Sequence, residues 1–135
     1  IMKNIIELYQ RFSKYKNNTY QELYQHITPS MNLNQYKVFQ DEQGTYGFVN
    51  WALLNDTTEQ QYKKTGKLNK DKWNTGNNVW LYDIIIIRKA KEVMRWVYHY
   101  FKDYLNVDEP INWLRLDEAN NIYRVSSKYK REFHI

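Results

Sequence analysis

The 135-residue sequence contains no cysteine, which excludes disulfides, thiolate metal sites and a cysteine nucleophile. Its three histidines, His26, His99 and His134, lie far apart and lack the spacing of metal ligands. We therefore predict no metal site. Apolar runs of the ~20 residues that span a bilayer are also missing, and no secretory signal is visible. These absences favour a cytoplasmic protein without a transmembrane segment.

Hydrophobic residues make up 42% of the chain, and 13 tyrosines and 5 tryptophans supply much of this apolar mass. That content is enough for a core, and the length suits a single domain. No internal repeat or linker is visible. We therefore predict one domain over residues 1–135, with a basic C-terminal tail at about 128–135.

The net charge of +5 favours an acidic partner, namely nucleic acid, anionic lipid or an acidic protein. The abundance of Lys, Asn, Ile and Tyr has an equally good explanation in an AT-rich genome. The basic residues of the tail, Lys128, Lys130 and Arg131, do not exceed ordinary surface charge. We therefore expect no nucleic-acid partner.

The first half of the chain shows two helices and a hairpin. Apolar residues at helical spacing predict a helix over residues 3–12. Thr19 followed by Glu22 is a capping box, so a second helix is expected from Tyr20 until Pro29 stops it. Two arms, residues 36–39 and 45–54, predict a β-hairpin.

The second half predicts a helix, a buried strand, a long helix and a hairpin. Asp56 and Glu59 form a capping signature for a helix that ends at Gly66. A buried strand is expected at residues 79–87, and the 3.6-residue period of 89–105 predicts the strongest helix of the chain.

Two runs, 111–116 and 122–127, close the chain as another hairpin. The resulting order is α-α-β-β-α-β-α-β-β. Because the strand-helix-strand connection should be right-handed, strand 79–87 should lie parallel to strand 111–116. The fold class is therefore α+β, with a mixed, mostly antiparallel central sheet flanked by helices.

One carboxylate, Asp83, interrupts the otherwise apolar strand "WLYDIIII". An unpartnered ionised carboxylate in an apolar interior costs several kcal/mol. Asp83 therefore either bonds a backbone or tryptophan N–H where strands splay, or it faces a cleft and orients a catalytic base. The residues alone leave both interpretations open.

Two blocks, "YGFVNWALLND" (46–56) and "DKWNTGNNVWLYDIII" (71–86), resemble the toxin-activating lysine acyltransferases of RTX toxins. The segment "ITPSMNLNQYKVF" (27–39) also fits this family, and the resemblance covers about residues 15–127. The shared positions are Trp51, Ala52, Leu54, Trp73, Thr75, Gly76, Trp80 and Asp83.

The resemblance implies a fold like that of the N-acetyltransferase (GNAT) superfamily and transfer of a fatty acyl group from acyl-carrier protein to a lysine. It implies a His–Asp pair, in which Asp83 matches the aspartate, whereas Tyr15 stands at the position of the histidine. Tyr15 could donate a proton to a leaving thiolate. His26 could replace the missing base, although a lone helical histidine is more often structural.

The donor site is less well defined by sequence. Arg88, Lys89 and Lys91 could hold an anionic donor by charge, but the turn lacks the glycines with which coenzyme A users cradle pyrophosphate. Trp51 and Trp80 could line a pocket or pack in the core. No permanently bound cofactor is expected; the donor would be an acyl-acyl-carrier protein or acyl-CoA.

The resemblance also implies a lysine-bearing protein substrate and, by analogy, a homodimer. The alternative function is a catalytically inactive GNAT-fold binding or interaction protein, for example a phage-encoded one. A pocket that reaches Asp83, with Tyr15 or His26 in hydrogen-bond range, would favour the enzyme.

Overall fold

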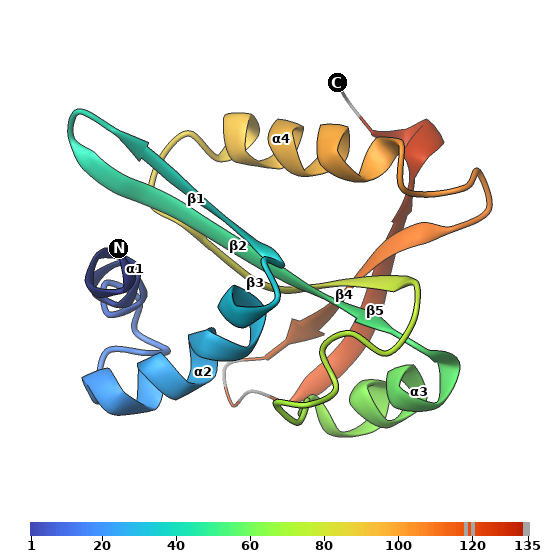
Figure 1. The fold of residues 1–135 in the computed structure, drawn as a ribbon, viewed down its shortest axis with the longest axis horizontal. Coiled ribbons are helices and arrows are strands. Elements are labelled where there is room, and N and C mark those ends of the chain that lie inside the picture. Colours follow the sequence, from blue (N-terminus) through green and yellow to red (C-terminus); the bar gives the residue numbers. More distant parts are fainter. Residues whose placement is uncertain (118, 120, 134–135) are drawn as a thin grey trace.

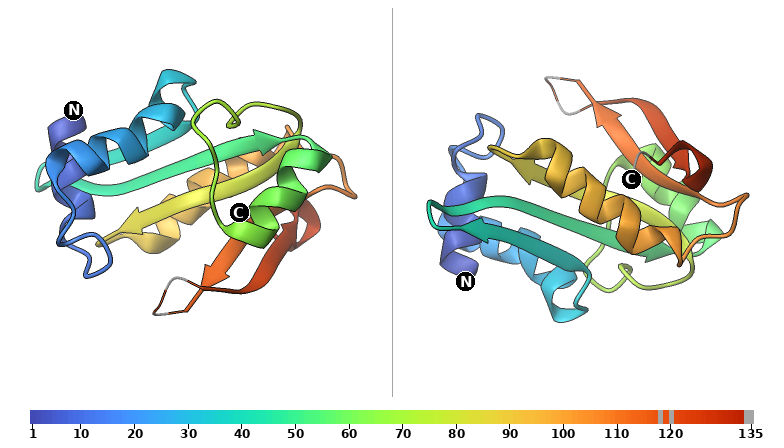
Figure 2. Two further views of the ribbon diagram at one scale, coloured as in Figure 1. Left: turned by 90° about the horizontal axis from the view of Figure 1, so that it is seen from below. Right: turned by 90° about the horizontal axis from the view of Figure 1, so that it is seen from above.

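A five-stranded sheet with helices on both faces forms the domain (Figure 1), and the computed structural model describes residues 1–117, 119 and 121–133. The strands follow one another in the order β1-β2-β3-β4-β5, and only β3 and β4 pair in parallel. The predicted element order and the mostly antiparallel sheet are confirmed. Helices α1, α2 and α3 cover one face of the sheet, and α4 covers the other (Figure 2).

The N-terminal layer consists of α1 (Met2–Tyr9) and α2 (Tyr20–Asn32). The predicted capping box of Thr19 and Glu22 is present in both directions. The prediction that Pro29 ends this helix is wrong, because α2 continues to Asn32. Burial of Ile27 and Ser30 against the sheet outweighs the hydrogen bond that a proline removes.

The first hairpin pairs β1 (Tyr36–Asp41) with β2 (Gly44–Leu54), as predicted. Helix α3 (Asp56–Thr65) follows, and Gly66 ends it in the left-handed conformation. Its N-cap is Asn55 rather than Asp56, since the Asn55 side chain accepts the N–H of Thr58.

The remaining elements are β3 (Asn78–Ile86), α4 (Ala90–Lys102), β4 (Pro110–Leu116) and β5 (Ile122–Tyr129). The predicted basic tail continues from β5 into a short 3₁₀ helix at Lys130–Glu132, and Phe133 is buried against Tyr98. His134 lies outside the described residues. No helix of the described chain is long and apolar enough to cross a membrane.

The sheet opens between β3 and β4. The parallel pairing covers three residue pairs, from Val79–Ile111 to Leu81–Trp113. Tyr82 and Asp83 follow directly on β3. Opposite them, Asn50 pairs with Asp83 while Trp51 pairs with Leu81, so Tyr82 is an extra residue in a β-bulge. The bulge allows Tyr82 and Asp83 to share the face covered by α2 and α3, which strict alternation would forbid.

The loop before β3 is fixed by backbone contacts at Gly76. A Cβ atom on Gly76 would lie 2.6 Å from the backbone N and Cα atoms of Asn55. Thr75 also accepts the N–H of Asn55 through its hydroxyl, at 2.9 Å. The Thr-Gly pair of the sequence motif therefore docks this loop onto the start of α3.

We predict that Gly76→Ala lowers the free energy of unfolding by about 1–3 kcal/mol, because the added methyl group meets rigid backbone. Urea unfolding monitored by circular dichroism measures this loss. Asn77→Ala, one residue later on an exposed side chain, is the matched control and should change stability by less than about 0.5 kcal/mol. Equal stability of Gly76→Ala and the wild type would contradict the proposed close approach.

Candidate active site

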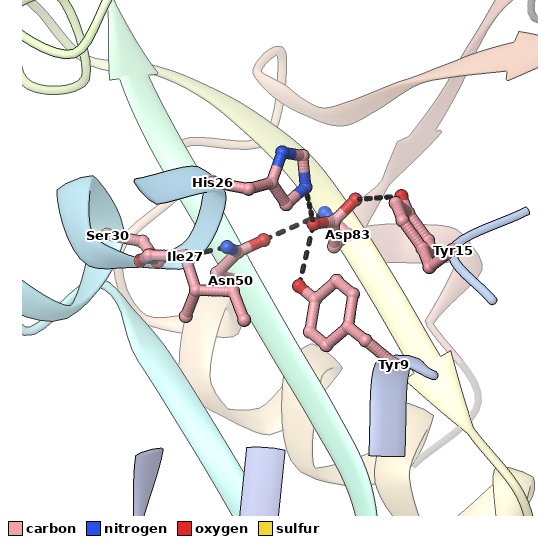
Figure 3. Close-up of polar contacts among 7 residues, drawn as sticks. All are labelled: Tyr9, Tyr15, His26, Ile27, Ser30, Asn50 and Asp83. Atoms are coloured by element: carbon pink, nitrogen blue, oxygen red, sulfur yellow. Dashed lines mark hydrogen bonds and ion pairs between the residues drawn. The ribbon is translucent and has the colours of Figure 1, made fainter. Parts of the chain in front are cut away.

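The Asp83 carboxylate lies at the centre of a polar network (Figure 3), and the residue is 7% exposed. Oδ2 accepts the hydroxyl of Tyr9 at 2.7 Å and lies 2.7 Å from His26 Nε2. Oδ1 accepts the hydroxyl of Tyr15 at 3.2 Å. The structure thus brings together all three predicted catalytic residues, Asp83, Tyr15 and His26, and it adds Tyr9.

The N-terminal elements position these three donors. Tyr9 is the last residue of α1 and is fully buried. His26 lies on α2 between Leu23 and Ile27, which are both buried, so the apolar contacts of this helix turn the imidazole towards the sheet. The Thr19 cap fixes the residue at which α2 begins. It therefore also fixes which turn of the helix places His26 next to β3.

Asn50 on β2 connects Asp83 to the same helix. Its Oδ1 accepts the backbone N–H of Asp83 at 2.8 Å, and its Nδ2 donates to Ser30 Oγ at 2.9 Å. The Ser30 hydroxyl in turn donates to the carbonyl of Ile27 at 3.0 Å. From the sequence, Asn50 could line a cleft, but a turn or edge role explained it adequately; the structure shows it fully buried on an interior strand of the sheet. The sequence signal that could have indicated this role is the single polar side chain of Asn50 within the apolar run "GFVNWALL".

The network keeps Asp83 ionised. Burial raises the pKa of Asp83, but the hydrogen bond and charge of His26, followed by the Tyr9 hydrogen bond, bring that pKa below its ordinary value. Burial and the Asp83 charge raise the pKa values of Tyr9 and Tyr15 well above the ordinary range. Both tyrosines therefore act as neutral hydrogen-bond donors, and Tyr15 is unsuited to be a base.

His26 has the geometry of an oriented base. An ionised carboxylate only accepts hydrogen bonds, so the His26 nitrogen that faces Asp83, Nε2, carries a proton. In the neutral ring the lone pair is then on Nδ1, which lies on the side of the ring away from Asp83 (Figure 3). The side chain is 28% exposed, and His26 lines a pocket, so part of its ring is open to solvent.

A pocket of about 130 Å³ opens beside this pair. It lies where β3 and β4 part, between Tyr82 and Asp83 of β3 and Leu114 and Leu116 of β4. Tyr62 of α3 forms another wall. Asp83 therefore faces a cavity and has a histidine within hydrogen-bond distance, as we expected for an enzyme.

The predicted donor residues lie elsewhere. Arg88 and Lys89 both bind Asp41, at 2.6 and 2.9 Å, and these contacts, with Arg88 first, lower the pKa of Asp41. Lys91 is exposed at the start of α4. Neither these three residues nor Trp51 and Trp80 line the pocket at Asp83.

Both tryptophans pack in the core. Trp51 contacts Trp96, Tyr100 and Phe101 beneath α4, on the face opposite Asp83. Trp80 is fully buried on the other face and donates its Nε1–H to Glu59 at 2.8 Å. Of the two interpretations of these tryptophans, the structure supports packing.

Within the described ranges, no group of three or more His, Asp or Glu side chains could hold a metal ion. His99 is exposed on α4.

Comparison with known proteins assigns the family. The profile of the RTX toxin acyltransferase family matches residues 1–130. The chain belongs to this family. It is similar to the RTX-II toxin-activating lysine-acyltransferase ApxIIC of Actinobacillus pleuropneumoniae, with 27% identity over 86 residues. That match covers 63% of this chain but only 54% of the relative, so the chain spans about half the length of the curated protein.

Family membership confirms the resemblance that the two sequence blocks predicted. The family's histidine position, inferred by counting along the sequence, is occupied by Tyr15. The imidazole that meets Asp83 comes instead from His26, about two helical turns into α2. Tyr15 is the second donor to the same carboxylate.

We predict that the tyrosines around Asp83 resist alkaline ionisation in the folded protein. Burial, followed by the Asp83 charge, raises the pKa of Tyr82 to about 12, and Tyr9, Tyr15 and Tyr62 are raised as well. A raised tyrosine pKa stabilises the native state fully below the unfolded value near 10, and this stability is lost as pH rises towards the folded value.

Absorbance at 295 nm during a pH titration checks this expectation. A native fraction of tyrosines should stay protonated at pH 11 and ionise only as the protein unfolds, with stability falling above about pH 10. Ionisation of all 13 tyrosines in one step near pH 10, with the fold intact, would contradict it.

Proposed function

We propose that the protein transfers a fatty acyl group to a lysine side chain of a protein substrate, with His26 as the general base and Asp83 as the group that orients it. The observation that carries this proposal is the 2.7 Å contact between His26 Nε2 and Asp83 Oδ2, beside a pocket, in a member of the RTX toxin acyltransferase family.

The chemistry follows from the need to deprotonate the acceptor. A lysine amine is mostly protonated at pH 7 and becomes a nucleophile only when a base takes its proton. His26 Nδ1 accepts this proton, and Asp83 stabilises the resulting imidazolium. The amine nitrogen then bonds to the thioester carbonyl carbon, and the C–S bond breaks. The proton held by His26 passes to the leaving thiolate, and the freed imidazole takes the second proton from the amide nitrogen and releases it to solvent.

The proposed donor is an acyl-acyl-carrier protein, with acyl-CoA as the alternative. Carrier proteins are acidic, so the net charge of +5 suits them. If the donor docks at the start of α4, it competes with Asp41 for Arg88 and Lys89 and meets an exposed Lys91. A cytoplasmic location remains a prediction from the sequence, and a homodimer remains a prediction by analogy.

The alternative, an inactive binding protein, rests on the missing family histidine at position 15. The presence of an imidazole from α2 at hydrogen-bond distance from Asp83 weakens this alternative. The pocket beside the pair weakens it further, since a protein that used the fold only for binding would not require it.

We predict that His26→Ala and Asp83→Asn each reduce acyl transfer by about 10²–10⁴-fold, because each removes the oriented base. Tyr15→Phe should lose at most about tenfold, since it removes one hydrogen bond and leaves the imidazole in place. Mass spectrometry of lysine peptides incubated with acylated carrier protein measures the transfer. His99→Ala, on an exposed position of α4, is the matched control and should retain full activity.

Circular dichroism should first show that each variant is folded. Loss of activity in Tyr15→Phe with retention in His26→Ala would assign the base to Tyr15. Absence of transfer by the folded wild type with several acyl lengths would overturn the proposed function.

A further inference from the structure

A second cavity, of about 850 Å³, lies between α2 and the loop that leads into β3, and the proposed mechanism does not use it. Ligand sites commonly measure about 300–1,000 Å³. The wall on α2 extends from Gln21 to Leu33, which is roughly 18 Å along the helix axis. An extended peptide advances about 3.3 Å per residue, so about five residues fit along this wall. We call this cavity the α2 groove.

Trp73, in the wall of the α2 groove, has an unused hydrogen-bond donor. The residue is only 2% exposed, and in the part of the chain that the structure describes its Nε1–H has no acceptor. Its position is fixed, because its ring centroid lies 4.5 Å from that of Tyr82 and its carbonyl accepts the side-chain N–H of Gln35 at 3.0 Å. Since a buried indole N–H usually has a partner, we expect a ligand carbonyl to accept it.

Both walls of the groove carry side-chain amides. Gln21, Gln25 and Asn32 lie on α2, Asn74 lies on the loop opposite, and all four are exposed. A side-chain amide both donates and accepts hydrogen bonds, as a peptide group does. The lining therefore matches a ligand that carries several amide groups.

The other lining residues narrow the choice of ligand. Lys70 and Asp71 are adjacent and opposite in sign, so the groove does not select a charged ligand. Tyr24 and Leu33, 42% and 41% exposed, offer apolar surface to a ligand side chain. A fatty chain would cover the amides and the indole N–H without bonding to them, which is costly. A nucleic acid would meet too little positive charge.

We propose that the α2 groove binds a short, extended and uncharged peptide segment, one carbonyl of which accepts the Nε1–H of Trp73. An extended chain presents N–H and C=O groups along both of its edges, which matches amides on both walls. The pantetheine arm of an acyl donor is also uncharged, but its amides are too few to pair with both walls along the length of α2.

The groove adjoins the proposed base. Gln25 and His26 are consecutive residues of α2, and the ring centroid of Tyr82 lies 4.5 Å from that of Trp73 and 5.6 Å from that of His26. A protein substrate can therefore occupy the groove with residues that flank its modified lysine. This assignment of the segment to the protein substrate rests on the proposed acyl transfer, whereas peptide binding itself does not.

A binding experiment without an acyl donor tests the groove. The probe is the uncharged pentapeptide acetyl-Ala-Leu-Ser-Val-Ala-methylamide, titrated into the full chain with ¹⁵N-labelled tryptophan and followed by NMR. Binding should shift the indole N–H resonance of Trp73 downfield, because it gains an acceptor. Gln25→Ala and Asn74→Ala, one on each wall, should each weaken binding about three- to tenfold, the equivalent of one lost hydrogen bond. Gln60→Ala, exposed on α3 outside the groove, is the matched control and should bind as the wild type does.

Three further ligands separate the proposed occupant from its competitors. The same pentapeptide with N-methylated amides lacks the N–H donors and should bind at least about tenfold more weakly. Pantetheine and 1-octanol represent the arm and the fatty chain of an acyl donor, and neither should displace the pentapeptide. The inference is overturned if the pentapeptide does not bind, if the Trp73 resonance does not move, or if both alanine variants bind normally. Displacement of the pentapeptide by pantetheine or octanol would also overturn it.

The outcome is independent of turnover. Peptide binding by a chain that transfers no acyl group would sustain the groove and contradict only the proposed function. Acyl transfer by a chain that does not bind the pentapeptide would contradict only the groove.

Discussion

A single ionised carboxylate, kept inside the domain by its hydrogen-bond partners, determines how the two halves of this structure meet. Asp83 lies on the central strand where β3 and β4 separate, and burial without partners would cost several kcal/mol. Its donors come from α1, from the segment after it, and from α2. Asn50 adds a fourth contact through the backbone. The N-terminal layer is thus held to the sheet by the same group that the proposed chemistry requires.

This shared role explains how the site accommodates Tyr15, at the position where the resemblance implied a histidine. Tyr15 and Tyr9 donate hydrogen bonds to the Asp83 carboxylate in place of water. His26 contacts the same carboxylate from a position in which its ring lines the pocket. The proposed base, His26, lies on a helix whose start is fixed by the Thr19 cap and whose apolar face packs on β2 and β3. A helix is a more rigid platform than a loop for a group that must be placed within tenths of an ångström.

The sequence was sufficient wherever a local pattern determined the outcome. The order of elements, the Thr19 cap and the buried strand around Asp83 follow from periodicity, capping chemistry and apolar content. The remaining features depend on tertiary contacts. Helix α2 continues past Pro29 because it packs on the sheet, and a β-bulge places Tyr82 and Asp83 on the same face of β3. The sequence named both Tyr15 and His26 as partners of Asp83 but could not choose between them as the base, and it did not predict the linking role of Asn50. Both outcomes depend on which helix turn lies above β3.

The tautomer of His26 tests the central claim most directly. Long-range ¹H–¹⁵N NMR of the imidazole, recorded at a pH where the ring is neutral, distinguishes the two nitrogens. An ionised Asp83 that orients the base predicts a proton on Nε2, shifted downfield by its hydrogen bond, and an unprotonated Nδ1; both features should be lost in Asp83→Asn. A proton on Nδ1, or the same spectrum in the wild type and in Asp83→Asn, would contradict the account.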